Sequence, residues 1–228
     1  MKLQAVRDEL SRCLIERDEQ VEMLLLGLLS SQNVCFVGPP GTGKSLMVDS
    51  LARCVDGAEY FGTLMHKFLP PDELVGQLML SELKNDRYRR MVAGFAPTAD
   101  LVFLDEIWKA SPALLNTLLN LLNERRFRNG DAVLDCPMWF AAAASNEWPI
   151  GEGYETTEAL FDRFLIRGHV HPVSSQALNR LLYDDLPTAG PVVTADDVRD
   201  AIDFAAKTSF CDDAKACMTE ILDALSNE

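Results

Sequence analysis

The chain has 228 residues, of which 48% are hydrophobic and 25% charged, and 21 lysines and arginines against 35 aspartates and glutamates give a formal net charge of −14. This composition is typical of globular proteins and argues against disorder. The longest apolar runs, such as residues 23–29, are far shorter than the ~20 residues of a membrane-spanning helix, so we expect no membrane span. The acidity disfavours non-specific binding to nucleic acid, which needs a positive field.

The cysteine pattern favours a reducing, cytoplasmic location. No CxxC pair is present, and charged residues interrupt the N-terminus where a signal peptide would be apolar. We therefore expect small buried thiols rather than disulfides or a zinc site. His169 and His171 could share one strand face, but without a third ligand nearby a metal site there is disfavoured. The cysteines are Cys13, Cys35, Cys54, Cys136, Cys211 and Cys217.

Helical and strand-like segments alternate along the chain. Residues 3–28 carry apolar side chains at helical spacing, with a break expected at Glu16–Glu19. Further helices are expected at 43–55, 112–124 and 156–163, and strands at 33–38, 60–66, 101–106, 138–145 and 164–170. Because the strands are continuous apolar runs separated by helices, the pattern predicts an α/β fold with a parallel sheet covered on both faces.

Local chemistry supports two of these assignments. A helix is expected to begin at Pro112, and Ser111 can cap it. Proline also suits a first helical turn, because the amide donor at that position has no partner within the helix. The alanine run 141–144 has helical propensity, but we expect a strand, because small residues can be needed where a strand is covered on both faces.

Two stretches fit the alternation less well. Residues 72–97 lie between the second and third strands and are expected to hold more than one short element. Residues 185–195 contain Pro187, Gly190 and Pro191 and are typical of a linker. Residues 196–228 then have the pattern of two amphipathic helices.

The strongest motif is GPPGTGKS, from Gly38 to Ser45, which fits GxxxxGK[ST] between an apolar strand and a helix. In such a loop, successive backbone N–H groups and the helix N-terminus converge on phosphate oxygens. Lys44 would neutralise the β- and γ-phosphates, and the Ser45 hydroxyl would ligate Mg²⁺. The expected nucleotide contacts are Gly38, Pro39, Pro40, Gly41, Thr42, Gly43, Lys44, Ser45 and Leu46.

Two further strand ends carry polar side chains. In LVFLDE, Asp105 and Glu106 follow four apolar residues, and the carboxyl ends of parallel strands are where ligands bind. Asp105 would hold Mg²⁺ through its water shell, and Glu106 would activate the water that attacks the γ-phosphate. Asn146, in ASNE, follows the next strand and would contact the γ-phosphate or that water, although a turn asparagine is the commoner fate of this residue type.

Arg163, in EALFDRFLIR, has two open interpretations. It is either a surface charge paired with Asp162 or an arginine finger supplied to a neighbouring subunit's nucleotide, where such a charge accelerates phosphoryl transfer.

These motifs together resemble the MoxR group of AAA+ ATPases, most closely its RavA branch. The resemblance rests on GPPGTGKS, the block from Leu101 to Gly130, the ASNE step and EALFDRFLIR, in consistent order, and it fades after about Asp184. It implies a three-layer αβα P-loop NTPase fold with a five-stranded parallel sheet. By resemblance, the Lys44 loop matches Walker A and Asp105 with Glu106 matches Walker B.

The resemblance also assigns the remaining segments. Asn146 matches sensor 1 and Arg163 the arginine finger acting in trans, while 72–97 falls where this clade has its helix-2 insert. Arg125–Cys136 falls where a hairpin is expected, and Asn129-Gly130 is a good two-residue turn. The implied domains are a core at 1–184, a linker at 185–195 and a partial helical lid at 196–228. No arginine follows Arg199, so a sensor 2 arginine is missing from this sequence.

The resemblance implies an ATP- and Mg²⁺-dependent hexameric ring that remodels or matures protein partners together with a von Willebrand factor A (vWA) protein. A nucleotide-dependent scaffold with little hydrolysis is the alternative, and a nucleic-acid-stimulated motor is disfavoured by the acidity. The basic clusters Arg87–Arg90 and Arg125–Arg128 could touch a substrate, although a solvated charge is the commoner fate of one arginine.

Overall fold

Five strands form one parallel sheet in the order β10-β1-β9-β6-β3 in the computed structural model, which describes residues 2–149 and 157–226. Val34 of β1 pairs with Ala142 of β9 on one side and with Ile166 of β10 on the other. The predicted α/β fold with a central parallel sheet is confirmed. The strands are β1 (Val34–Val37), β3 (Tyr60–Leu64), β6 (Leu101–Asp105), β9 (Phe140–Ser145) and β10 (Ile166–His169).

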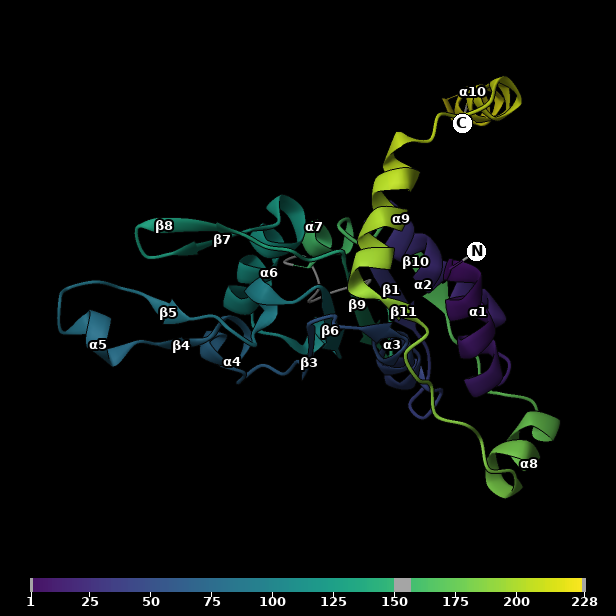
Figure 1. Cartoon of the computed structure of the whole chain (residues 1–228), viewed down its shortest axis with the longest axis horizontal. Helices are drawn as coiled ribbons and strands as arrows, with labels where there is room; N and C mark the ends of the chain where they lie inside the picture. Colours follow the sequence, from purple (N-terminus) through teal and green to yellow (C-terminus); the bar gives the residue numbers. More distant parts are fainter. Residues whose placement is uncertain (1, 150–156, 227–228) are drawn as a thin grey trace.

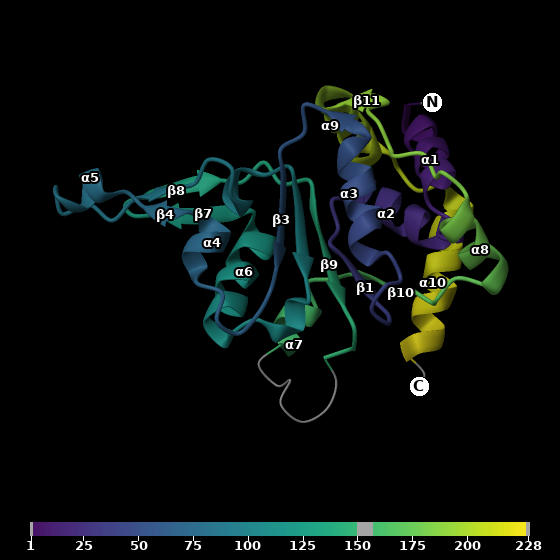
Figure 2. The ribbon, with the colours of Figure 1, turned by 90° about the horizontal axis from the view of Figure 1, so that it is seen from below.

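Helices cover both faces of this sheet (Figure 2). On β1, Val34 and Phe36 pack into one apolar cluster, while Cys35 and Val37 pack into the other. Successive side chains of a strand point to opposite faces, so each strand contributes to both clusters and is apolar throughout. One face carries α1 (Lys2–Cys13), α2 (Asp18–Ser30) and α3 (Lys44–Arg53); the other carries α4 (Pro71–Val75), α6 (Pro112–Glu124) and α7 (Glu158–Phe161).

Elements with a clear local signal lie where they were predicted. The helix α6 has its expected bounds, and the Ser111 side chain accepts a hydrogen bond from Leu114 N. The alanine run is part of β9, as expected. The helix predicted at 156–163 is shorter, because α7 covers only Glu158–Phe161, and residue 156 lies outside the described residues.

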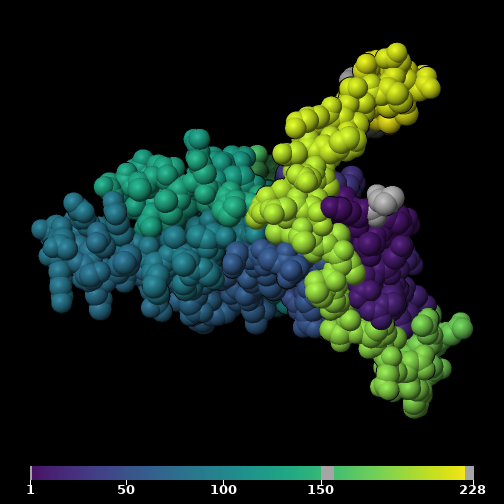
Figure 3. All heavy atoms as spheres, viewed as in Figure 1, coloured from purple at the N-terminus to yellow at the C-terminus, as the bar shows by residue number. Residues whose placement is uncertain are grey.

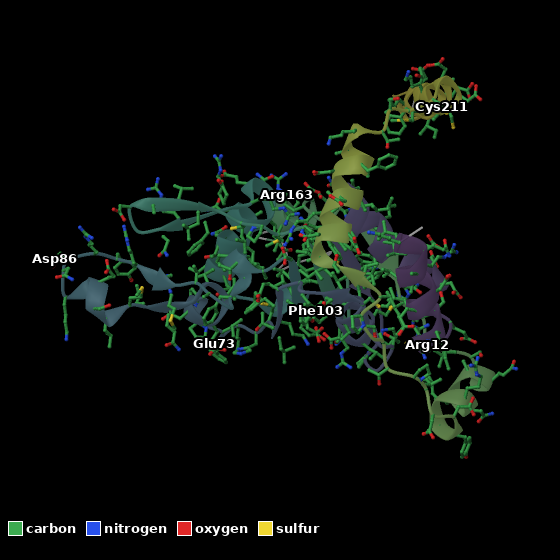
Figure 4. The ribbon with its side chains drawn as sticks, viewed as in Figure 1. Arg12, Glu73, Asp86, Phe103, Arg163 and Cys211 are labelled. Carbon is green, nitrogen blue, oxygen red and sulfur yellow. The ribbon has the colours of Figure 1, made fainter. Side chains whose placement is uncertain are left out.

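The stretch 72–97 holds several short elements, as predicted, and projects from the core beside a hairpin (Figure 1). Figure 4 labels Asp86 at its far tip. The elements from Pro71 onward are α4, β4 (Gln77–Leu78), α5 (Leu80–Leu83), β5 (Arg90–Met91) and the 3-10 turn Ala96–Thr98. Another 3-10 turn, Ile107–Lys109, follows β6.

The neighbouring hairpin consists of β7 (Arg126–Asn129) and β8 (Ala132–Asp135). The prediction of Asn129-Gly130 as its turn is wrong by one residue, because Asn129 pairs with Ala132 and the loop is Gly130-Asp131. Gly130 adopts the positive φ of 68°. The Asn129 carboxamide is engaged by the backbone of Arg90, which explains why this residue stays in the strand.

The C-terminal part leaves the core in two places (Figure 3). The helix α8 (Ser175–Tyr183), which the sequence reading missed, projects outward, and the segment after it ends in β11 (Val193–Thr194), which pairs with β2 (Val55–Asp56). The two predicted C-terminal helices are α9 (Ala195–Lys207) and α10 (Asp212–Ser226). α9 packs against α2, whereas α10 stands away from the core. The division at 185–195 stays a prediction.

Four of the cysteines are buried, but the expectation for the other two is wrong. Cys211 and Cys217 are exposed, because the helix α10 and the turn before it do not pack on the core. No helix of the described residues is both long and apolar enough to cross a bilayer.

Candidate functional site

Three neighbouring strands deliver their polar ends to one edge of the sheet. Gly38 follows β1, Asp105 ends β6, and Asn146 follows β9, which lies between the other two. The strands are parallel, so these carboxyl ends lie together at the edge where ligands bind in open α/β sheets. Gly38 N donates to Ser145 O at 3.2 Å, which ties the first loop to the end of β9.

The loop Gly38–Ser45 needs glycine for two different reasons. A Cβ on Gly38 would lie 2.2 Å from the carbonyl oxygen of Val170, so only glycine allows this close approach. Gly43 precedes α3 with φ of 82°, a left-handed conformation that glycine adopts without strain. The helix therefore begins at Lys44 with its N-terminus facing the loop.

Lys44 is buried, and its ammonium group has a full set of partners. Nζ donates to Gly38 O at 2.7 Å, to Pro39 O at 3.0 Å and to Asn146 Oδ1 at 3.1 Å. Burial lowers the pKa of Lys44, and the charges of Asp105 and Glu106 partly oppose that shift. The cation is thus held at the loop without a direct ion pair to either carboxylate, and its positive charge faces the cavity.

Ser45 and Asp105 form an oxygen pair beside this lysine. Ser45 Oγ donates to Asp105 Oδ2 at 3.1 Å, joining the start of α3 to the end of β6. Asp105 Oδ1 accepts from the backbone of Glu106 at 3.0 Å, which orients the carboxylate.

Glu106 directly follows β6 in a left-handed conformation, with φ of 52°. This conformation is uncommon for a residue with a Cβ and is typical of functional turns. Its Oε1 accepts a hydrogen bond from the side-chain amide of Asn146. Its Oε2 is buried, 3.1 Å from Lys109 Nζ, within ion-pair distance but not aligned for a hydrogen bond. Asn146 therefore bridges Lys44 and Glu106.

These side chains line one polar cavity of about 410 Å³, which contains Lys44, Ser45, Asp105, Glu106 and Asn146 together with 40–43 and Leu46. A second hollow of about 350 Å³ shares the loop wall and is largely apolar. Its other walls come from the α1–α2 turn, the segment after β10, and Leu178 and Leu181 of α8.

Comparison with known proteins gives the chain its family. Residues 1–200 match the sequence model described as the MoxR domain in the MoxR-vWA-beta-propeller ternary systems. The chain belongs to the MoxR family of AAA+ ATPases. The RavA branch stays a prediction.

Curated relatives match most of this chain, and one of those below carries the MoxR name. An uncharacterized protein of Methanocaldococcus jannaschii, MJ0079, is 40% identical over 177 residues, which are 76% of this chain and 45% of that protein. Chaperone MoxR1 of Mycobacterium tuberculosis is 28% identical over 177 residues, 77% of this chain and 46% of that protein. The MoxR chain thus spans about half the length of these curated relatives.

A solved structure from Cytophaga hutchinsonii, described as a candidate ATPase, has the same fold. It superposes with a TM-score of 0.75 and 19% identity, covering 98% of this MoxR chain and 68% of that chain.

Arg163 does not join the cavity of its own MoxR chain. Its carbonyl oxygen accepts a hydrogen bond from Asn33 Nδ2 at 3.0 Å, and Asn33 precedes β1 whereas the phosphate loop follows it. The four residues of β1 separate these two edges of the sheet by about 13 Å. The side chain is exposed and makes no hydrogen bond or ion pair with another described residue. The Asp162 carboxylate instead lies 3.8 Å from Arg167.

Arg17, at the turn between α1 and α2, is a site residue that was not predicted from the sequence. It is 7% exposed, and its guanidinium donates to Thr42 O from Nε at 3.2 Å and from Nη2 at 3.0 Å, and to His171 O at 3.0 Å. Burial lowers its pKa. The preceding Glu16 accepts from the backbone and hydroxyl of Ser174, where α8 begins. The only sequence feature that marked this contact was the charged pair Glu16-Arg17 within the expected helix break.

Proposed function

We propose that this MoxR-family chain binds ATP with Mg²⁺ in the polar cavity and hydrolyses the γ-phosphate bond. The observation that carries the proposal is the connected set of side chains at one sheet edge, in which Asn146 joins Lys44 to Glu106. A lysine, a hydroxyl, two carboxylates and an amide around one cavity are the groups that phosphoryl transfer to water needs.

In this proposal Lys44 exchanges its present carbonyl and amide partners for the β- and γ-phosphate oxygens. Glu106 accepts a proton from the attacking water, and Asn146 holds both that carboxylate and the phosphate end of the substrate. The apolar hollow beside the loop would take the base, because it is continuous with the loop wall and lined by leucines.

Ser45 and Asp105 are the residues that would hold Mg²⁺. Their oxygens lie 3.1 Å apart, and hard oxygen donors of this kind suit magnesium. When bound, the metal would neutralise charge on the phosphate oxygens.

We further propose that Arg163 acts on a neighbouring subunit in a ring. Its backbone is anchored at the edge of the sheet opposite to the phosphate loop, and its exposed guanidinium is uncommitted among the described residues. An arginine supplied in trans can stabilise the transition state by orders of magnitude. A hexamer is the ring size expected from the family.

The proposal for the protein partners rests on the family and not on the residues of the site. The matched family description names ternary systems with vWA and beta-propeller proteins, and one relative is named a chaperone. We propose a vWA-containing partner and a chaperone-like action on client proteins, driven by the nucleotide cycle, with the protein working in the cytoplasm.

Steady-state ATPase and nucleotide affinity of the purified chain test this proposal. We expect Lys44→Ala to lose nucleotide binding and Glu106→Gln to keep binding while turnover falls at least a hundredfold, because the first residue contacts phosphate and the second moves a proton. Undiminished turnover in both variants would overturn the site assignment. Tight binding with no turnover in an assembled wild-type ring, even with its partner, would favour the scaffold function instead.

Mixed assemblies test the trans role of Arg163. Lys44→Ala subunits lack a working cavity but carry the arginine, and Arg163→Ala subunits have the opposite defect. Mixing them should recover activity above that of either variant alone. Stimulation by DNA that falls with salt would instead indicate a nucleic-acid motor.

A further inference from the structure

Asn33, just before β1, is a buried polar residue that joins three segments distant in sequence. Its side chain is one of few polar groups in the core, with the residue 5% exposed. Oδ1 accepts from Arg125 Nη2 at 3.0 Å and from the backbone of Ala141 at 3.1 Å, and Nδ2 donates to Arg163 O at 3.0 Å. These partners belong to the end of α6, to β9 and to the segment between α7 and β10.

The orientation of this carboxamide is fixed by its partners. A backbone N–H such as that of Ala141 can only donate, and so can a guanidinium, so both must face the amide oxygen. The amide nitrogen then faces the carbonyl of Arg163, which can only accept. Asn33 is thus the one side chain in this arrangement that supplies a donor and an acceptor at once.

The segment around Arg163 also depends on the backbone of Asn33. Ile166 N donates to Asn33 O at 3.3 Å, and Phe164 is fully buried between these two contacts. The backbone is therefore held on both sides of Phe164, while the exposed guanidinium of Arg163 projects from it; Figure 4 labels Arg163 close to α7. A small shift of this backbone would be amplified along the arginine side chain.

We propose that Asn33 is a positioning residue for Arg163: its amide group fixes the backbone from which the arginine reaches a neighbouring subunit's nucleotide. The inference rests on the proposed trans role of Arg163. It adds that a residue in the core of one subunit, beside the start of its own β1, governs hydrolysis in the next subunit rather than in its own cavity.

The substitution Asn33→Asp separates this role from a general structural one. A carboxylate keeps both acceptor contacts, to the Arg125 guanidinium and to Ala141 N–H, but it has no proton to donate to the Arg163 carbonyl. Asn85→Asp is the matched control, because it makes the same chemical change in the exposed insert. Nucleotide affinity should be unchanged in both variants. Turnover of assemblies made only of Asn33→Asp should fall about ten- to a hundredfold, as misplacement of a catalytic group does.

The ATPase activity of mixed assemblies then gives a measurement that a merely structural role of Asn33 would not change. Asn33→Asp subunits mixed with Lys44→Ala subunits should recover activity, because the latter donate a well-placed arginine to an intact cavity. Asn33→Asp mixed with Arg163→Ala should not recover, because neither subunit supplies that arginine. If Asn33→Asp does not fold, Asn33→Ser takes its place. Its short hydroxyl loses the contact to Arg163 together with that to Arg125, and the same two mixtures then distinguish a misplaced arginine from damage to the variant's own cavity.

The other outcomes overturn the proposal in distinguishable ways. Recovery with Arg163→Ala but not with Lys44→Ala would mean that Asn33 serves its own cavity. Full turnover of the variant, or a loss of nucleotide affinity with recovery in neither mixture, would remove the positioning role. Absence of recovery in the reference mixture of Lys44→Ala with Arg163→Ala, in assemblies shown to be mixed, would instead overturn the trans arrangement itself.

Discussion

Arg17 donates two hydrogen bonds to the carbonyl oxygen of Thr42, so the turn between α1 and α2 holds the phosphate loop from behind. A third bond, to His171 O, ties the same guanidinium to the segment after β10. The guanidinium is buried and has no carboxylate partner among the residues that the structure describes, which is costly unless its donors are satisfied. We infer that this side chain keeps the loop in the shape that receives phosphate.

Replacing Arg17 by alanine should therefore weaken nucleotide binding about tenfold and lower stability, because it leaves the buried carbonyl of Thr42 without its donor at a cost of about 1–3 kcal/mol. Arg17→Lys should recover part of the affinity, since an ammonium can still donate to Thr42 O. Titration with a fluorescent nucleotide and thermal unfolding would measure both effects. Arg12→Ala, which removes an exposed arginine paired with Glu9, is the control and should change neither. Wild-type affinity in Arg17→Ala would contradict the inference.

The sequence predicted those parts of the site whose chemistry is local. The loop Gly38–Ser45 and the acids Asp105 and Glu106 each follow an apolar strand directly, so motif and strand end could be identified together. Parallel strands then bring these ends to one edge. The bounds of α6 were predicted for the same reason, because Ser111 and Pro112 are start signals in adjacent positions.

The contacts of Arg17 and Asn33 could not be predicted, because they join residues far apart in sequence. Asn33 meets Arg163 across a separation of 130 residues, and no periodicity or spacing marks such a pair. Arg125 shows the same limit. Its place in a basic run suggested a solvated charge, but its side chain is half-buried and contacts Asn33 and Met138. Tertiary packing alone decides which member of a charged run enters the core.

The Mg²⁺ affinity of the nucleotide complex should depend on the Ser45 hydroxyl. Ser45→Ala removes one oxygen of the pair with Asp105, and we expect the magnesium affinity of the nucleotide complex to fall by at least the ten- to hundredfold typical of groups that support metal ligands. Ser45→Thr retains a hydroxyl at the same position and should behave like the wild type. Titrating Mg²⁺ at fixed nucleotide concentration measures the difference, and equal midpoints for the alanine and threonine variants would refute the assignment.

Nucleotide affinity should fall as pH rises through the lowered pKa of Lys44. Burial holds this pKa below its ordinary value of 10.5, and bound phosphate would raise it again, so binding takes up a proton in the intervening range. Affinity should then decrease by up to about tenfold per pH unit there.

The lowered pKa of Lys44 should also change the stability of the free protein, but stability should rise with pH where nucleotide affinity falls. A lysine whose pKa is lowered by folding binds fewer protons in the folded than in the unfolded state, so its contribution to the free energy of unfolding rises with pH between the lowered pKa and 10.5. Lys44→Arg, which stays charged, should flatten both profiles. A wild-type affinity that is independent of pH in this range would contradict the prediction.

Asn129 should couple the insert to the neighbouring hairpin. Its side chain accepts from Arg90 N at 2.7 Å and donates to Arg90 O at 3.0 Å, as a strand partner would. The adjacent Asp131 pairs with Arg89 at 3.0 Å, and a Cβ on Gly130 would lie 2.4 Å from Tyr88 O, so the turn is fitted closely against the insert.

We expect Asn129→Ala to raise amide hydrogen exchange in residues 77–91 about thirtyfold, because the insert strand loses two hydrogen bonds of about 1 kcal/mol each and its remaining ion pair with the hairpin, Arg89–Asp131, is exposed. Nucleotide affinity should not change, since Asn129 does not line the polar cavity. Arg126→Ala removes an exposed ion pair with Asp135 within the hairpin and serves as the control. Exchange mass spectrometry on the intact chain distinguishes the two variants. Equal protection of the insert in both would show that Asn129 does not hold it, and that the two projections move independently.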